Sequence, residues 1–307
     1  MKPKILLKQV INTYRILKRS VLHFGSNRPI GLSGTTAFFA IFSIVPILII
    51  IISVFGYFTG SEIISQKLFN ELNVLIGQES TELLKSAITN YKIAEKSGIG
   101  TFIGVIFFLI SATTLFGVLQ DSINYIWRVK PKSNLKNNIL KMLKDRLLSF
   151  GVILTLGFIL LVSLFIDASI AFFKDFLTLN FGPRLVIFAQ IVNVVFALAI
   201  ITVVFLLIYR FLPDVNVEWD AALFGASFSA LMFTAGKVLI GIVIGNSKLG
   251  VVYGAASSFV VILIWIYYVS ILFYFGVELT RQYSIFYNHK NTPQNYAVPF
   301  EITTGDK

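Results

Sequence analysis

The stretch YGAASSFVVILIWIYYVSILFYFGVELTRQY, residues 253–283, decides the fold class. It carries no charge before Glu278 and contains no proline. About 20 apolar residues in a helix, each rising about 1.5 Å, cross a hydrocarbon core about 30 Å thick. Aromatic residues follow in its second half, and Glu278 and Arg281 close it. The stretch therefore predicts a membrane-spanning helix, the last one in the chain.

The composition of the whole chain agrees with a membrane protein. Of its 307 residues, 56% are hydrophobic and 13% are charged, whereas a soluble domain carries about 25% charged residues. The net charge of +11 would suggest nucleic acid in a soluble protein, but in a membrane protein it marks the cytoplasmic side and contact with anionic lipid. The absence of cysteine excludes disulfides, zinc–thiolate sites and thiol nucleophiles.

Six apolar stretches predict an all-α, polytopic membrane helix bundle with six transmembrane helices. The predicted spans are residues 34–58, 99–127, 147–170, 185–212, 221–244 and 253–283. They make up a membrane domain of residues 33–283, which includes a polar connection at 59–98 and is followed by a tail at 284–307. In the polar connection we expect one or two short amphipathic helices outside the membrane, broken near Gly77.

The distribution of Lys and Arg predicts the orientation. With the N-terminus inside, 18 of the 26 basic residues fall in inner segments and seven in outer ones. Cytoplasmic loops carry the excess of Lys and Arg. The bias therefore predicts that both termini are cytoplasmic.

Residues 1–32 combine apolar positions at helical spacing with basic positions on most of the remaining surface. The apolar positions are Leu7, Val10, Tyr14, Leu17, Val21 and Phe24. This pattern fits an amphipathic helix in the membrane interface, and it fits equally a basic flank that only fixes orientation. No short apolar core with a small-residue cleavage site is present, so we expect no cleaved signal.

The first predicted span has a proline in its middle. Pro46 removes a backbone donor, so we expect a kink or a break there. An ordinary kink is the simpler interpretation, and a discontinuous helix that lines a cavity is the functional one. The polar residues on the entry half give the second interpretation some weight. They are Ser33, Thr35, Thr36 and Ser43.

Several stretches, in this order and spacing, resemble the YihY/BrkB family of bacterial inner-membrane proteins, once mislabelled as ribonuclease BN. They are TAFFAIFSIVPILIIIISVFG (36–56), LQDSINYIWRVKPK (119–132), YRFLPDVNVEWDAALFGASFSALMFTAGK (209–237) and VYGAASSFVVILIWIYYVSILFYFGVELT (252–280). The resemblance implies six membrane helices and a multi-pass position in a bacterial inner membrane. It also implies a link to serum resistance and to export of envelope lipid or lipopolysaccharide, without a settled biochemical activity.

Lys237, inside the fifth predicted span, is the sharpest single candidate for function. A cation in a span is costly unless it reaches the interface, pairs or faces water. Its long stem could extend to the headgroups, or it could face a cavity that receives an anionic headgroup. We place Lys237 with Thr36, Ser43 and Pro46 as candidate contacts of such a cavity.

A second group of polar residues falls near the predicted inner ends of the spans. Its members are Asp121, Asn124, Arg210, Glu278 and Arg281. Glu278 and Arg281 are three residues apart, so an ion pair along one helix face is the simpler interpretation. A polar cluster that gates a pathway or relays protons is the sharper one.

We expect no enzyme, no cofactor and no metal site. The two histidines, His23 and His289, lie near opposite ends of the chain, and neither has a partner at metal-ligand spacing. No Ser-His-Asp order or phosphate-binding glycine loop is present. The basic loop at 128–146 lacks the interleaved aromatics of nucleic-acid surfaces, so we expect no nucleic-acid partner.

Two hypotheses for function follow. The first is a transporter or flippase for an anionic envelope lipid or another amphiphile, with the first, fifth and sixth spans lining its path. The alternative is a non-transporting scaffold that organises the envelope through its basic face. In both, membrane lipids are the expected partners, and the sequence leaves a homo-oligomer open.

Overall fold

The computed structural model describes residues 3–94, 114–132, 183–245 and 252–301, together with five single positions between 151 and 162. Apart from those five positions, the predicted third span lies outside the described residues, as do the first half of the second span and most of the basic loop at 128–146. The bounds of the described elements are α1 Pro3–Ser26, α2 Pro29–Thr59, α3 Ser61–Ile76, α4 Gln78–Ala94, β1 Val129–Pro131, α7 Pro183–Phe211, α8 Trp219–Gly245, η1 Gly254–Ala256, α10 Ser257–Phe286 and β2 Ala297–Pro299. Residues 114–127 are also helical.

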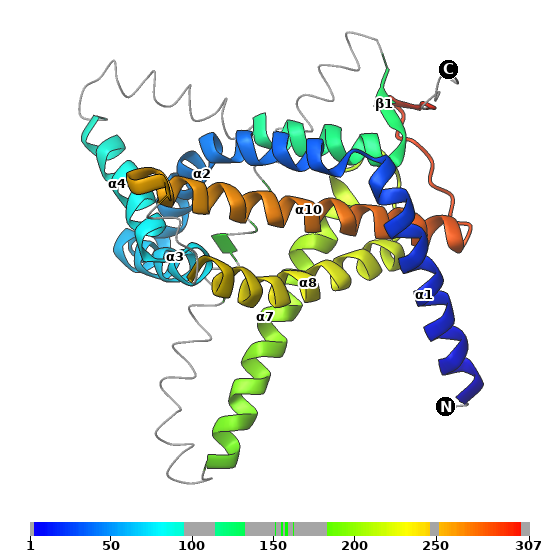
Figure 1. The fold of residues 1–307 in the computed structure, drawn as a ribbon, viewed down its shortest axis with the longest axis horizontal. Helices are drawn as coiled ribbons and strands as arrows, with labels where there is room; N and C mark the ends of the chain where they lie inside the picture. The colour runs from blue at the N-terminus through cyan, green and yellow to red at the C-terminus, as the bar shows by residue number, and fades with distance from the viewer. Residues whose placement is uncertain are drawn as a thin grey trace.

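Helix α10, which contains the stretch that opened the sequence analysis, is the centre of the fold. It packs against α1, α2 and α8, and its first turns also contact α3 and α4. In Figure 1, α10 crosses the middle of the molecule between α2 and α8, with the α3–α4 pair at one end and α1 at the other. We call the end of α10 near α3 and α4 the hairpin end, and the end that carries Glu278 and Arg281 the arginine end.

Four described helices are long and apolar enough to cross a membrane. They are Pro29–Thr59, Val194–Phe211, Trp219–Ile240 and Ser257–Phe286. They coincide with the predicted first, fourth, fifth and sixth spans, so the helical character of these stretches is confirmed. The total of six spans and the cytoplasmic position of both termini stay predictions.

Helix α2 runs without interruption through Pro46. The discontinuous helix considered for this span is therefore wrong. The helix also begins earlier than expected, at Pro29 rather than at Gly34. A proline fits the first turn because the N–H that it lacks would have no partner there. An interior proline such as Pro46 is tolerated in membrane helices where neighbouring groups satisfy the freed carbonyl.

The polar connection after α2 forms a helical hairpin, α3 and α4. The break between them falls at Gly77, as predicted, where the backbone has a φ of 80°. Glycine adopts this left-handed region without the steric cost that a side chain adds. Ser80 Oγ of α4 donates to the carbonyl of Ser258 at 3.2 Å, which fixes the hairpin to the start of α10.

The core has two parts. The part at the arginine end packs Tyr209 and Tyr274 against fully buried alanines of α8 such as Ala226. The part at the hairpin end is built from larger side chains of α2, α3, α4 and α10, such as Ile64 and Trp265. Small residues let helix backbones approach closely, so the two parts differ in how tightly the helices can meet.

The chain after α10 returns along the arginine end. Strand β1 pairs with β2 in an antiparallel two-stranded sheet, and Val215 forms a bridge with Pro293. The all-α prediction therefore needs the addition of this short sheet. It was missed because each strand has three residues and is defined by a partner about 170 positions away rather than by any local pattern.

Candidate functional site: a basic cleft at the arginine end

The site begins with the short linker between α1 and α2. Asn27 is buried there, and Arg28 has a left-handed backbone with a φ of 52°. The conformation is unusual for a residue other than glycine, and it turns the chain from α1 into α2. Asn27 is thereby placed beside the last turns of α10.

Glu278 lies next to Asn27 and has no exposed surface. Its Oε2 accepts a hydrogen bond from Asn27 Nδ2 at 2.8 Å, and its Oε1 accepts one from Gln282 Nε2 at 2.7 Å. Arg281 Nη1 lies 3.6 Å from Oε1, which is the predicted ion pair along the helix face. A buried carboxylate is costly unless it is paired and hydrogen-bonded, and here both oxygens are engaged.

Arg128 joins the same network from the end of the 114–127 helix. Its Nη2 donates to Asn27 Oδ1 at 2.7 Å, and its Nη1 donates to the carbonyl of Tyr125 at 3.2 Å. The guanidinium also lies 5.1 Å from the centre of the Tyr125 ring. Asn27 thus connects a buried carboxylate on one side with a guanidinium on the other.

These residues border an open cleft of about 310 Å³. Its walls come from α1, the α1–α2 linker, the residue after the 114–127 helix and the end of α10. They consist of Arg19, His23, Ser26, Asn27, Arg128, Arg281, Gln282 and Ile285. Within the part of the chain that the structure describes, Arg19 and Arg128 have no carboxylate partner, and Glu278 balances one of the three arginines. The cleft therefore carries an excess of positive charge.

A second polar network lies nearby on the 114–127 helix. Asp214 is fully buried, and its carboxylate accepts hydrogen bonds from Gln120 at 2.9 Å and Asn124 at 2.8 Å. The Asp214 backbone N–H donates to Asn124 Oδ1 at 2.8 Å, and its carbonyl accepts the N–H of Gln294. This network fastens the α7–α8 turn and the returning chain to the 114–127 helix, whose end holds Arg128.

Two buried tyrosines join the helices between the arginine end and the middle of the bundle. Tyr209 of α7 bonds Ser229 of α8 at 2.9 Å and donates to the carbonyl of Phe273 at 2.9 Å. Tyr274 of α10 shares a hydrogen bond with Thr36 of α2. Each polar tip is thereby satisfied inside an apolar surrounding.

Beyond Tyr274, toward the hairpin end, lies an apolar cavity of about 350 Å³. Side chains of α2, α3, the 114–127 helix, α7, α8 and α10 form its wall. The hydroxyl-bearing side chains of this wall are Thr36 and Ser270, and both hydroxyls already donate to backbone carbonyls of their own helices. The cavity therefore offers a surface suited to hydrocarbon.

The structure separates the four residues proposed to line a cavity. Thr36 is part of the wall, whereas Ser43, Pro46 and Lys237 are not. Ser43 is buried and donates to the carbonyl of Phe39, and Pro46 is buried inside α2. Lys237 is half-buried on α8, with no ion pair to a described residue.

The five residues of the predicted polar cluster fall into different surroundings. Glu278 and Arg281 belong to the basic cleft, and Asn124 belongs to the Asp214 network. Arg210 instead donates to the carbonyl of Val217 and lies 5.3 Å from the centre of the Trp219 ring. Asp121 is exposed on the 114–127 helix.

Sequence reasoning missed the residues that complete the cleft and the network beside it. They are Arg19, Asn27, Arg128, Gln120, Asp214 and Gln282. A signal existed for Asp214, since an acid in the stretch joining two apolar helices must be solvated or paired. Asn27 and Arg128 lie in basic segments, and membrane topology already accounted for the charge of those segments. Their contacts also join residues that are 251 and 101 positions apart in the chain.

The apolar helices and the position of the polar networks at their ends define the class: a membrane protein built as a helix bundle. The chain matches the family described as Virulence factor BrkB over residues 21–298. It therefore belongs to that family, which confirms the resemblance seen in the sequence.

Several curated relatives bear the name UPF0761 membrane protein. One from Acinetobacter baylyi is 25% identical over 260 residues, which cover 84% of this chain and 59% of the relative. One from Psychromonas ingrahamii is 28% identical over 258 residues, which cover 81% and 80%. One from Pseudomonas aeruginosa is 27% identical over 247 residues, which cover 80% and 56%. The chain thus spans less than two thirds of two of these relatives. No solved structure matches it.

Proposed function

We propose that the protein binds an anionic amphiphile of the cell envelope and moves it across the membrane. The basic cleft would receive the anionic group, and the apolar cavity would receive the hydrocarbon. The observation that carries the proposal is the pair of arginines, Arg19 and Arg128, that border the cleft without a carboxylate partner among the described residues. They replace Lys237 as the cations that would meet the headgroup.

The chemistry of the cleft favours a phosphate or a carboxylate. Arginine presents a planar set of donors that matches the oxygens of these groups, and its weak hydration makes it suited to partly buried sites. Glu278 is satisfied by Asn27, Gln282 and Arg281. Its charge is therefore held away from an incoming anion, and its contacts fix the geometry of the cleft.

The positions of the two sites suggest a path along α10. Arg281 of the cleft and Ser270 of the cavity lie on the same helix, about 16 Å apart along its axis. Tyr274, hydrogen-bonded to Thr36, stands between them. An amphiphile that moves from the cleft toward the cavity would have to pass this contact.

The proposal includes the topology expected from the sequence. Six spans with both termini cytoplasmic, in the inner membrane, would place the basic cleft at the cytoplasmic surface, where anionic lipids attract cations. No catalytic step and no nucleic acid are part of it.

A scaffold function is the second candidate, and α1 favours it. Figure 1 shows α1 leaving the bundle with its N-terminal part beside no other described helix. Basic and apolar side chains of this helix are exposed, among them Lys18, Val10 and Tyr14. Such a helix could lie on a membrane surface or hold a partner without any transport.

A translocation assay in reconstituted vesicles tests the first candidate against the second. The probe is a fluorescent phosphatidylglycerol, with fluorescent phosphatidylcholine for comparison. We expect wild-type protein to accelerate movement of the anionic probe across the bilayer. In the Arg19→Gln/Arg128→Gln double variant this rate should be lower by a factor of about ten or more, because two charge-assisted contacts disappear.

Arg15→Gln is the matched control, since Arg15 is an exposed arginine of α1 that does not border the cleft. It should leave the rate unchanged. Wild-type vesicles that behave like protein-free ones would reject transport and leave the scaffold candidate.

A further inference from the structure

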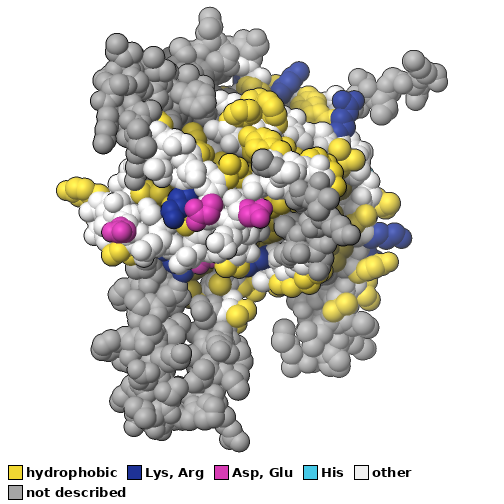
Figure 2. Space-filling view, turned by 60° about the vertical axis from the view of Figure 1, so that its left-hand side comes forward, with side chains coloured by type: hydrophobic (Ala, Val, Ile, Leu, Met, Phe, Trp, Pro, Cys, Tyr) yellow, Lys and Arg dark blue, Asp and Glu magenta, His cyan; other side chains and the backbone are white. Residues whose placement is uncertain are grey.

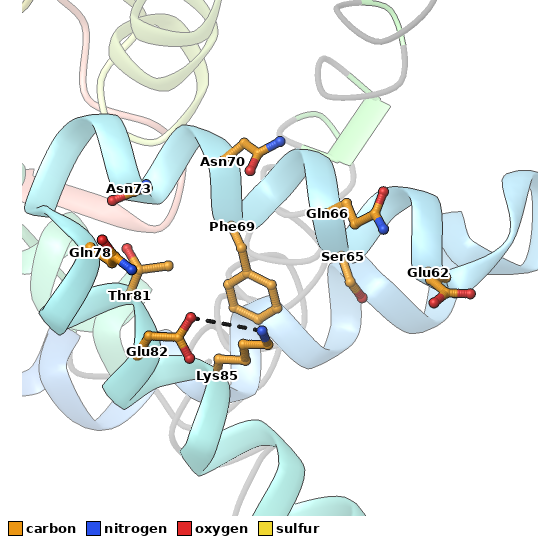
Figure 3. A pocket seen from close by; sticks show the side chains of 10 residues that line it. All are labelled: Glu62, Ser65, Gln66, Phe69, Asn70, Asn73, Gln78, Thr81, Glu82 and Lys85. Carbon is orange, nitrogen blue, oxygen red and sulfur yellow. Dashed lines mark ion pairs between the residues drawn. The ribbon is translucent and has the colours of Figure 1, made fainter.

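A polar groove lies between α3 and α4 at the hairpin end, far along α10 from the basic cleft. Its volume is about 480 Å³, within the range of about 300–1,000 Å³ that is usual for small-molecule sites. Figure 2 brings this side of the molecule forward and shows acidic and basic side chains among uncharged polar surface. Figure 3 shows the side chains that line the groove.

Four amide side chains border the groove. Gln66, Asn70 and Asn73 come from α3, and Gln78 comes from the first turn of α4. None of the four amides is hydrogen-bonded to another residue in the described part of the chain. Each carries two donors and one acceptor with two lone pairs. The groove thus offers many unused donors and acceptors to a ligand that has both.

An aromatic ring lies among these amides. In Figure 3, Phe69 points from α3 toward α4, into the space between the two helices. The residue is half-buried and packs on the core at the hairpin end, which holds the ring in place. A ring beside hydrogen-bonding groups suits a ligand with an apolar face and a polar edge.

The charges at the groove exclude an anion as the preferred ligand. Lys85 and Glu82 form an ion pair at 3.8 Å across one turn of α4. Glu62 is a further carboxylate at the other end of the groove, as Figure 3 shows. The lining is therefore slightly acidic, in contrast to the three arginines of the basic cleft.

We propose that the α3–α4 groove binds an uncharged, hydroxyl-rich ligand, namely one to a few saccharide units. The hydroxyl groups of a sugar both donate and accept, as the four amides do, and its C–H face fits the ring of Phe69. This inference does not rest on the proposed transport function. The groove includes no residue of the basic cleft or the apolar cavity. An experiment can therefore reject saccharide binding without rejecting transport, and the reverse also holds.

The test measures binding of neutral trisaccharides to the full chain in phosphatidylcholine nanodiscs, which avoid detergents with sugar headgroups. The probes are maltotriose and tri-N-acetylchitotriose, and saturation-transfer difference NMR reports the contact. We expect at least one of them to bind. The Gln66→Ala/Asn73→Ala double variant should then weaken its affinity by about fivefold or more, because two hydrogen-bonding groups are lost.

Asn90→Ala is the matched control, since Asn90 is an exposed amide of α4 outside the groove. It should bind as the wild type does. The inference is overturned if neither trisaccharide gives a transfer signal, or if the double variant and the control bind equally. A signal from the cation spermidine with none from the sugars would overturn it as well.

Discussion

The two ends of α10 are built on opposite principles. At the arginine end, buried polar side chains such as Glu278 and Asp214 have partners on distant segments, and the core at this end contains fully buried alanines of α8. At the hairpin end, aliphatic and aromatic side chains surround a hollow of about 350 Å³. Directional hydrogen bonds hold the helices together at the arginine end. At the hairpin end the helices are held by apolar contacts, and these leave a cavity between them.

The difference has a physical reason that bears on function. A buried polar group must be satisfied, so a network of them specifies one arrangement of the helices. An apolar wall makes no such demand, because dispersion contacts are non-directional. The proposed transport of an amphiphile would need a stable frame and an adaptable space, and the two features lie at different positions along α10.

Removal of Asp214 should be the most damaging change. Asp214→Ala leaves the buried amide donors of Gln120 and Asn124 without their acceptor, and each unsatisfied group costs about 1–3 kcal/mol. We expect the free energy of unfolding in mixed micelles to fall by at least about 2 kcal/mol. Asp220→Ala is the control, since Asp220 is half-exposed and should cost less than about 1 kcal/mol. Equal effects would show that the Asp214 network does not fix this end.

The second largest effect is expected from a substitution that disturbs the close packing of α8 and α10. A Cβ added at Gly276 would lie 1.9 Å from Ser229 Oγ and 2.3 Å from Tyr209 Oη. Gly276→Ala should therefore lower the free energy of unfolding by about 1–3 kcal/mol, the usual cost of overpacking. Gly117→Ala, at a helical glycine with nothing within 4 Å, should be neutral or slightly stabilising. The measurement is the thermal unfolding midpoint of the two variants under the same conditions. Equal midpoints would contradict the close packing at Gly276.

The hollow at the hairpin end should tolerate filling, unlike the packed end. Ala40 lines the apolar cavity, so the ring of Ala40→Phe can enter existing space and should change the free energy of unfolding by less than about 1.5 kcal/mol. Transport of the anionic probe should nevertheless fall. Ala235→Phe, on an exposed position of α8, should leave transport intact. A large loss of stability in Ala40→Phe would mean that the space is not available.

The smallest effect is expected at the surface of the hairpin. Lys85 and Glu82 are more than half exposed, at 56% and 57% of their side-chain surface, and such pairs contribute about 0–1 kcal/mol. Lys85→Ala should therefore shift the midpoint of unfolding by no more than about a degree or two. A shift comparable to that of Gly276→Ala would contradict the contrast between the two ends.

The four apolar helices that the structure describes followed from the sequence because hydrophobicity and length alone identify such helices. The helices around Pro46, Trp265 and Ala226 were placed within a few residues, and the break at Gly77 was found from a single glycine. The short sheet was not, and the choice between a kinked and a broken helix at Pro46 was left open. Both features depend on which residues lie beside the segment in space, and the local sequence carries no pattern for such contacts.

The site was predicted only where its partners are neighbours in the chain. Glu278 and Arg281 are one turn apart, so helical spacing was enough to pair them. Asn27, Arg128 and Asp214 take their roles from contacts across about 90 to 250 positions, for which no local pattern exists. Lys237 attracted attention because a cation inside a span is costly, yet the cleft that gathers cations lies elsewhere.

The most direct test of the central claim is a count of bound lipids. Native mass spectrometry of the protein, released from nanodiscs that contain equal amounts of phosphatidylglycerol and phosphatidylcholine, would measure which lipid each molecule retains. The basic cleft predicts preferential retention of phosphatidylglycerol by the wild type and by Arg15→Gln, and loss of that preference in Arg19→Gln/Arg128→Gln. Equal retention of the two lipids by the wild type, or an unchanged preference in the double variant, would contradict it.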